Sequence, residues 1–530
     1  MSQAILLFQN LMSPKKEERQ AAEKQLEDIK KGNFQQALNI FNEGMSSNQD
    51  NIAQLSTLLL KKSFCDDETA LNSLSPKDKE SLLTLIRSQI NFSKTWKTLQ
   101  QTADALARVY KATNMQAGIA EILNWFSDQN NAVSRKFAVY LIDILCEINA
   151  ITESILDQTA IQNFTSIFSK GLGDPDIDVK VFSLNTTIHF LANIKEDKTI
   201  TCFNGLADIL INVFIEILKH ENDQNSKNFG KSAIEAMIEI IEAHPKFWET
   251  KIEALINIVN EISKGPIFSN KIREAALEIV YSITTSSPAI IKKTAGFKTM
   301  FIPLLFNLLL EIDSVDKVEV WEKSLEEDEN DKEEMYYAVR EGFERLAVDL
   351  GGVYFMNVTS EFIKKYLTSQ NWIEVHAAFT ALGNMADGCK DVYNKNIKEL
   401  LSYISTGLVH FHQRVRYIAL FAFGCILKII KPKYLKTYTP NILPGLAILM
   451  SEKEPSLRVK TQACNVLVEY LRALLKEELS TEEAQEIIAN YTTDLVKLVS
   501  SLFEYSLTVS YPPLQEASAS CISLLSNLLD

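Results

Sequence analysis

The residues best equipped for chemistry in this 530-residue chain form an acidic run. Residues 311–334 contain twelve acidic residues and three lysines, which gives this segment a net charge of −9 in a chain of net charge −14. Carboxylates at this density attract basic proteins, although a run of charge also suits a solvated loop. The negative balance disfavours a general nucleic-acid-binding surface. The charge pattern therefore indicates binding of basic protein partners.

Motifs that carry catalysis or metal binding do not occur in the sequence. There is no GxSxG or HExxH motif, and the Gly-Lys-Ser at 230–232 lacks the glycine that begins a phosphate-binding loop. His410 and His412 have no evident third metal ligand. None of the seven cysteines forms a CxxC pair. We therefore expect no enzyme activity, no catalytic residue, no cofactor and no metal site.

The composition favours long helices joined by short connections. The chain has only 17 glycines and 13 prolines, roughly half the usual share of each, which is too few breakers for a sandwich, a barrel or a disordered chain. At the N-terminus an apolar stretch precedes the basic residues, the reverse of a signal peptide. The most apolar run, 300–312, is too short to span a bilayer. These features predict a soluble intracellular protein with no membrane insertion.

A repeated unit sets the positions of these elements. A polar or proline-containing turn followed by an amphipathic helix recurs at intervals of 40 to 55 residues, apart from one gap of 103. This period is that of a two-helix HEAT unit. The apolar residues near the start of the recurring helices are Val133, Val179, Phe229, Ile272, Val375, Val415, Val459 and Leu514. The predicted fold is an all-α HEAT-repeat solenoid, a superhelical arch of roughly twelve helix pairs.

Individual helices can be predicted from their ends. A helix over 13–32 should end at the cap Gly32, and the helix over 337–352 should end at a glycine as well. Helices are also expected over 52–64 and 99–112. Proline after a capping residue predicts helix starts at Ser13, Ser75, Asp174, Ser287 and Thr439. The basic residues that follow the apolar anchors (Lys180, Arg273, Arg416 and Lys460) are expected to pair with the aspartate of an adjacent turn, as is typical of HEAT arrays.

Two features in order along the chain resemble the karyopherin-β (importin-β) family. Ala22, Glu23 and Leu26, followed by the leucine-rich stretch with paired lysines at 58–62, are similar to the family's N-terminal Ran-binding module. The tryptophan-containing acidic insertion at 320–334 is followed by helical segments in the order that one family branch uses. The resemblance implies four regions: a Ran-binding region at 1–115, central HEAT repeats at 116–310, an acidic loop at 311–336 and a candidate cargo-binding arch at 337–530.

The resemblance also implies particular functional residues. The acidic loop is expected to contact Ran through Glu326, Glu327, Asp328, Glu329, Asp331, Glu333 and Glu334, and Asp104 is the best single Ran-binding candidate in the first repeats. Cargo recognition is expected from Asn384, Asp387 and Glu469. Asn384 and Asp387 lie three apart and would share a helix face. Ordinary solvent-facing polar residues and a plain charged loop are the structural alternatives at each position.

The function implied by the resemblance is that of a monomeric nuclear transport receptor. Such a receptor binds basic cargo carrying a nuclear localisation signal, passes FG nucleoporins, and releases cargo on binding Ran-GTP, shuttling between cytoplasm and nucleus without contacting nucleic acid directly. Its inner wall should be acidic. Family members run to roughly twice this length, so the chain would be an N-terminal half. The alternative is a HEAT-repeat scaffold that organises a phosphatase- or condensin-type complex.

Overall fold

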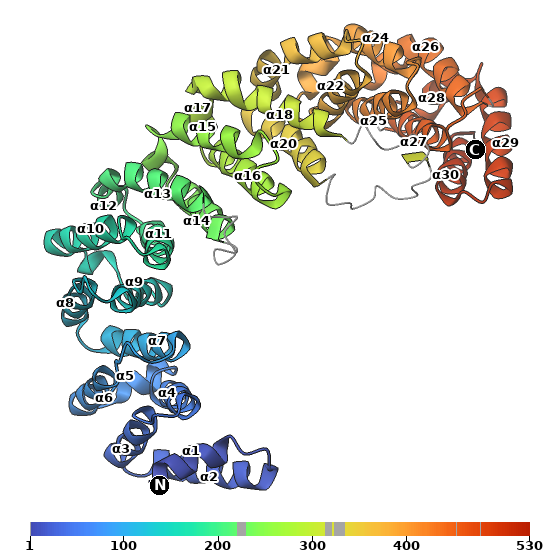
Figure 1. Ribbon diagram of the computed structural model, residues 1–530. Coiled ribbons are helices and arrows are strands. Elements are labelled where there is room, and N and C mark those ends of the chain that lie inside the picture. The colour runs from blue at the N-terminus through green and yellow to red at the C-terminus, as the bar shows by residue number, and fades with distance from the viewer. Residues whose placement is uncertain are drawn as a thin grey trace. The chain divides into compact units, whose positions relative to one another are not determined.

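The computed structural model describes residues 2–219, 229–312, 321–322, 334–451, 453–476 and 479–529. Within these ranges the secondary structure is helical, with no strand (Figure 1). The prediction of an all-α HEAT-repeat solenoid is therefore confirmed. No described helix is both long and apolar enough to cross a membrane. The helices cluster into two compact units, residues 1–251 and 252–530.

Each repeat of the first unit pairs a first helix with a second helix. The first helices are α1 (Gln3–Leu11), α3 (Phe34–Met45), α6 (Pro76–Ser88), α8 (Met115–Phe126), α10 (Gln158–Leu172) and α13 (Ala207–Lys219). The second helices are α2 (Lys16–Lys31), α4 (Asp50–Phe64), α7 (Trp96–Ala112), α9 (Ala132–Glu147), α11 (Ile177–Ala192) and α14 (Phe229–Ala243), and α5 (Glu68–Ser73) and α12 (Asp197–Thr201) are short connecting helices. From α4 to α14 the second helices pack side by side, which we call the second-helix row.

The second unit continues the same pairing. Its first helices are α15 (Ile252–Ser263), α17 (Pro288–Lys293) with α18 (Ile302–Leu308), α21 (Gly352–Leu367), α24 (Ile397–Leu408), α26 (Pro432–Met450) and α29 (Thr492–Thr508). Its second helices are α16 (Asn270–Ser286), α20 (Glu334–Leu350), α22 (Trp372–Asn384), α25 (Gln413–Ile429), α27 (Leu457–Leu474) and α30 (Pro512–Leu529), and α23 (Lys390–Lys395) and α28 (Thr481–Ile488) are short. Within this unit the second helices α22, α25, α27 and α30 also pack side by side. They form the second-helix row of the second unit, which lies on its concave side (Figure 1).

The ends of several helices follow local sequence rules. Ser75 accepts a hydrogen bond from the backbone N–H of Asp78, and Pro76 begins α6 without losing a helical hydrogen bond. The helix α2 ends at the predicted cap Gly32. The helix α20 ends at Leu350, before Gly351, whose φ of 76° favours glycine. These predicted ends are confirmed.

Three predicted helix starts are wrong. The helix α2 begins at Lys16 with Lys15 as its N-cap, and Ser13 Oγ instead accepts a hydrogen bond from the Lys15 N–H at 3.2 Å. Thr439–Pro440 lies inside α26, where Thr439 Oγ1 donates to the Leu435 carbonyl oxygen at 2.6 Å and lies 2.6 Å from the Tyr470 hydroxyl. Burial of this stretch against α27 keeps the helix continuous although Pro440 has no N–H. The helix α11 is capped by Asp176, because Asp174 is taken by a buried arginine.

Candidate binding groove on the second-helix row

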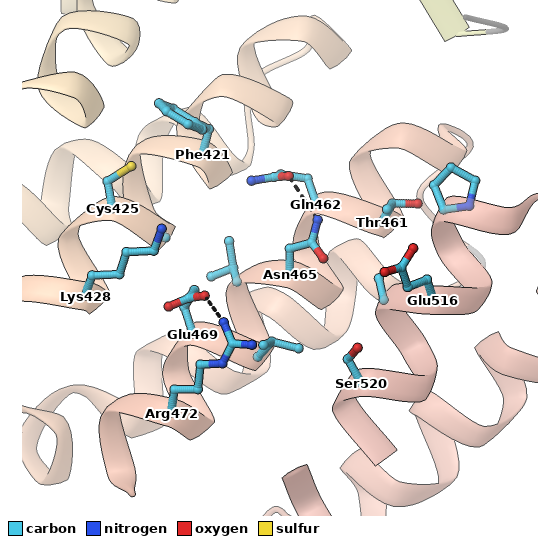
Figure 2. Close-up of a pocket in the computed structure, with 15 residues that line it drawn as sticks. Phe421, Cys425, Lys428, Thr461, Gln462, Asn465, Glu469, Arg472, Glu516 and Ser520 are labelled. Carbon is cyan, nitrogen blue, oxygen red and sulfur yellow. Dashed lines mark hydrogen bonds and ion pairs between the residues drawn. The ribbon is translucent and has the colours of Figure 1, made fainter. Parts of the chain in front are cut away.

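Helices α25, α27 and α30 pack side by side and leave a groove on their solvent side, with a cavity volume of about 430 Å³. All three helices contribute to its lining (Figure 2). The lining residues are Phe421, Gly424, Cys425, Lys428, Thr461, Gln462, Asn465, Val466, Val468, Glu469, Arg472, Pro513, Glu516, Ala517 and Ser520. The central helix α27 supplies polar residues at spacings of three and four, so that they share one helix face.

The groove combines carboxylates with amides. Glu469 Oε1 accepts a hydrogen bond from Arg472 Nη1 at 2.7 Å, and Asn465 Nδ2 donates to Gln462 Oε1 at 3.4 Å (Figure 2). Glu516 faces them from α30. Carboxylates bind lysine and arginine side chains, whereas amides can both donate to and accept from a peptide backbone. This set of groups suits an extended peptide with basic side chains.

The groove itself is not acidic. Lys428 and Arg472 balance the charges of Glu469 and Glu516 among the residues that line it. Arg472 is 61% exposed and Glu469 is 19% exposed, so the arginine covers the carboxylate from the solvent side. The expectation of a negative inner wall is therefore wrong for this stretch, because an arginine three residues along the helix neutralises the predicted carboxylate.

The predicted cargo residues occupy different settings. Glu469 lies in the groove. Asn384 is the last residue of α22, and its Nδ2 donates to the Thr380 carbonyl oxygen at 2.7 Å. Asp387 lies in the turn that follows, so the prediction that Asn384 and Asp387 share a helix face is wrong. Gly388 of the same turn lies in close contact with the backbone of Ala347. Neither residue lines the groove, and their roles in binding remain predictions.

Asp104 belongs to an ion-pair cluster in the first unit. Its carboxylate accepts hydrogen bonds from Lys61 Nζ of the neighbouring helix α4 and, at 2.9 Å, from Arg108 Nε one turn along α7. Asp66 lies 3.7 Å from Lys61 Nζ and 3.6 Å from Arg108 Nε. The cluster joins α4 to α7, which is a structural role for Asp104. Its contact with Ran remains a prediction.

Most of the predicted acidic loop lies outside the described residues. This applies to Glu326, Glu327, Asp328, Glu329, Asp331 and Glu333, whereas Glu334 is the first residue of α20. Trp321 and Glu322 of the same insertion are described, and they contact the beginning of α27. No group of three or more His, Cys, Asp or Glu residues in the described ranges is arranged to hold a metal ion.

A charged cluster in the first unit was not predicted from the sequence. His189 on α11 lies between two carboxylates, with Nδ1 2.7 Å from Asp143 Oδ1 on α9 and Nε2 3.3 Å from Glu239 Oε2 on α14. Hydrogen bonds to Asp143 and Glu239 raise the pKa of His189 to about 10. The imidazolium thus joins three consecutive helices of the second-helix row at neutral pH.

This cluster predicts a pH-dependent contribution to stability. Because the folded-state pKa of His189 lies above the unfolded value of about 6.5, the contribution is complete below pH 6.5 and is lost as the pH rises towards 10. We expect His189→Gln to destabilise the first unit by about 1–2 kcal/mol at pH 6, a value reduced for solvent screening because about a third of the side chain is exposed. Thermal unfolding at pH 6 and pH 10 should show the difference shrinking; a constant difference would contradict it.

Sequence reasoning identified Glu469 but missed the rest of the groove. The spacing of Gln462, Asn465, Glu469 and Arg472 is a usable signal, because it places four polar residues on one face of α27. Lys428 and Glu516 come from α25 and α30, and nothing local in their sequences indicates that they face the same space.

Three family descriptions match parts of the chain. The model described as "Importin repeat" matches residues 268–357, "IPO5-like, TPR repeats" matches 95–258, and "HEAT-like repeat" matches 372–426. Among curated proteins, the chain is 23% identical over 508 residues to importin subunit beta-3 of Saccharomyces cerevisiae, covering 94% of this chain and 45% of that protein. The chain thus spans about half the length of this relative.

Solved structures share the fold. A crystal structure of Kap121p bound to Ste12p matches with a TM-score of 0.82 and 20% identity, covering 98% of this chain and 48% of that one. A crystal structure of Kap121p bound to RanGTP matches with a TM-score of 0.79 and 20% identity, covering 99% of this chain and 48% of that one. At this level of identity, the likeness supports the same HEAT-repeat architecture.

Proposed function

We propose that this chain is a member of the karyopherin-β (importin-β) family and acts as a nuclear transport receptor for basic cargo, which the matches to importin repeats and to importin subunit beta-3 support. In this proposal the receptor binds a nuclear localisation signal as a monomer, passes FG nucleoporins and shuttles between cytoplasm and nucleus. The observation that carries the proposal is the groove on α25, α27 and α30, which places carboxylates beside amides on the second-helix row.

The groove supports recognition of an extended lysine-rich peptide. Glu469 and Glu516 offer carboxylates to two basic side chains, while Gln462 and Asn465 offer donors and acceptors to the backbone between them. Arg472, being largely exposed, can turn into solvent when a lysine of the peptide approaches Glu469.

Release by Ran-GTP is the second part of the proposal. The resemblance of the N-terminal repeats to a Ran-binding module supports it, as does the structure of the related Kap121p with RanGTP. A solenoid transmits small changes between neighbouring repeats, because each repeat contacts only its neighbours. Ran-GTP bound to the first repeats, with the acidic insertion as a further contact, would thus lower the affinity for cargo.

The test is binding of a fluorescent lysine-rich peptide to the chain, measured by anisotropy. We expect Glu469→Lys with Glu516→Lys to weaken binding by about tenfold or more, since two attractive charges become repulsive in a partly desolvated groove. The matched control is Glu486→Lys, because Glu486 is 68% exposed and pairs only loosely with Lys436, at 3.4 Å, outside the groove. Equal affinities of the groove variant and the control would contradict the assignment.

The same assay tests release. GTP-loaded Ran added to the peptide complex should lower the anisotropy, whereas GDP-loaded Ran at the same concentration should leave it unchanged. Equal effects of the two forms, or no effect of either, would count against a transport receptor. Loss of peptide binding with rising salt is the expected electrostatic signature.

A further inference from the structure

A dipeptide of the acidic insertion is docked on the second-helix row of the second unit. Glu322 Oε1 accepts a hydrogen bond from the backbone N–H of Leu457 at 2.6 Å, and Glu322 Oε2 accepts one from the Ser456 hydroxyl at 2.6 Å. Ser456 is the N-cap of α27. A carboxylate at a helix N-terminus is held both by unpaired N–H groups and by the helix dipole. The insertion is therefore attached to a helix that follows it by more than 130 residues.

The neighbouring tryptophan fills a matching aromatic slot. The ring of Trp321 lies 5.5 Å from that of Tyr417 in an edge-to-face arrangement, and the Arg458 guanidinium lies 4.5 Å from its centroid. Arg458 also donates from Nη1 to the Trp321 carbonyl oxygen at 2.6 Å. The Arg414 guanidinium lies 5.8 Å from the same ring centroid. Two arginines and a tyrosine thus hold one aromatic side chain through cation–π and edge contacts.

The slot adjoins the candidate groove. Tyr417 lies one helical turn before Phe421 on α25, and Arg458 lies one turn before Thr461 and Gln462 on α27. Because α25 and α27 pack side by side, Tyr417 and Arg458 continue the groove between these two helices. Figure 1 shows the short yellow segment of residues 321–322 near α27, in agreement with its hydrogen bonds to that helix. A peptide that runs along the groove beyond Phe421 and Thr461 meets Trp321 and Glu322.

We propose that Trp321 and Glu322 form an intramolecular latch. This dipeptide, an aromatic residue followed by a carboxylate, occupies one end of the groove and competes there with a long bound peptide. The competition rests on the proposed function of the groove, whereas the docking stands on the contacts of Trp321 and Glu322 alone. The slot would accept the same dipeptide chemistry from a separate peptide once the latch is removed.

The docking is tested without any cargo. In the variant Trp321→Ala with Glu322→Ala, we expect hydrogen exchange of the Leu457 amide to rise at least about tenfold, because the carboxylate that accepts its hydrogen bond is lost. A peptide with the sequence of residues 319–323, Glu-Val-Trp-Glu-Lys, should bind this variant in trans and fail to bind the unaltered chain. Trp321→Phe alone is the rescue control, because it keeps an aromatic ring and the carboxylate. Unchanged exchange at Leu457 would overturn the latch.

The competition is tested with lysine-rich peptides of two lengths. The latch variant should bind a long peptide about three- to tenfold more tightly than the unaltered chain, and a short peptide that fits between Phe421 and Ser520 equally well. Equal affinities for the long peptide would overturn the competition. If neither chain binds either peptide, the proposed function and the competition both fail, and the exchange measurement still decides whether the dipeptide docks.

Discussion

Asp174→Ala is expected to destabilise the first unit by about 3–5 kcal/mol, because it leaves a buried arginine without its anionic partner. Asp174 and Arg135 form a two-pronged ion pair with distances of 2.7 and 3.0 Å, and their side chains are only 4% and 6% exposed. Arg135 Nη1 donates to the carbonyl oxygens of Asp128 and Gln129, both at 3.0 Å. The substitution therefore removes the negative charge and leaves the positive charge in place.

The ion pair also joins two neighbouring repeats. The loss of stability in Asp174→Ala should therefore be largest in the helices that the pair connects. Arg135 lies in the first turn of the second helix α9, and Asp174 lies in the turn between α10 and α11 of the following repeat. Urea unfolding combined with hydrogen exchange should show the loss in α9 and α11 first. The control is Asp178→Ala, since Asp178 is 48% exposed in its ion pair with Lys136 and should lose less than about 1 kcal/mol.

Two outcomes would contradict this account. Equal losses for Asp174→Ala and Asp178→Ala would show that burial does not set the energy of the pair. The double variant Arg135→Met with Asp174→Leu should recover most of the stability, because it removes both charges and keeps apolar volume. A double variant as unstable as Asp174→Ala would show that packing of the turn, rather than the unpaired charge, is responsible.

Similar ion pairs recur along the solenoid, and their basic residues could be predicted from the sequence. The predicted aspartate partner is wrong, because Lys180, Arg273 and Arg416 pair with glutamates (Glu216, Glu311 and Glu454). Arg416 on α25 forms a two-pronged pair with Glu454 of the next turn, at 2.7 Å for both contacts. Arg273 binds the Ser263 carbonyl oxygen and Glu311. Lys460 differs, because its Nζ lies 4.9 Å from the ring centroid of Tyr505. The acidic partner lies 36 to 39 residues away in the paired cases, so local sequence could not identify it.

Helix periodicity predicted the elements well, and its errors have local causes. The repeat pattern predicts that Val133 is the apolar residue that begins its helix, but Val133 is 37% exposed and Ser134 is buried in its place. The arginine that pairs with Asp174 sits one position further along, so the pattern was out of register by one residue. Thr439–Pro440 carries a helix-start signal, yet burial of α26 against α27 overrides it. Tertiary packing decides between local alternatives of similar energy.

The groove and the latch were less predictable, because their parts meet only in three dimensions. The groove takes residues from α25, α27 and α30. Each of these helices is amphipathic because it packs against its neighbours, so its pattern does not reveal a binding surface. The sequence indicates a tryptophan-containing acidic insertion at 320–334, but Tyr417 and Arg458, which contact this tryptophan (Trp321), follow it by about a hundred residues or more. Charge composition can indicate that an insertion binds something, whereas the bound surface depends on the fold.

Gly388→Ala is expected to destabilise the second unit by about 2–3 kcal/mol, because the added methyl group has no room. A Cβ atom at Gly388 would lie 2.4 Å from the carbonyl carbon of Ala347 and 2.6 Å from the backbone nitrogen of Val348. Gly352 meets the same turn from the other side, since its Cβ would lie 2.4 Å from the Gly388 carbonyl oxygen. Backbone atoms on both sides cannot move away as a flexible side chain could.

The matched control is Gly445→Ala, which makes the same change in the same unit. Gly445 lies inside α26, and a Cβ atom there would meet nothing within 4 Å. Because alanine favours a helix interior over glycine, Gly445→Ala should stabilise the unit by about 0.5–1 kcal/mol. Hydrogen exchange of the most protected amides of α22 and α26 measures both effects. If both variants shift stability in the same direction, close backbone packing does not explain the turn that ends α22 and places Asp387 outside the helix.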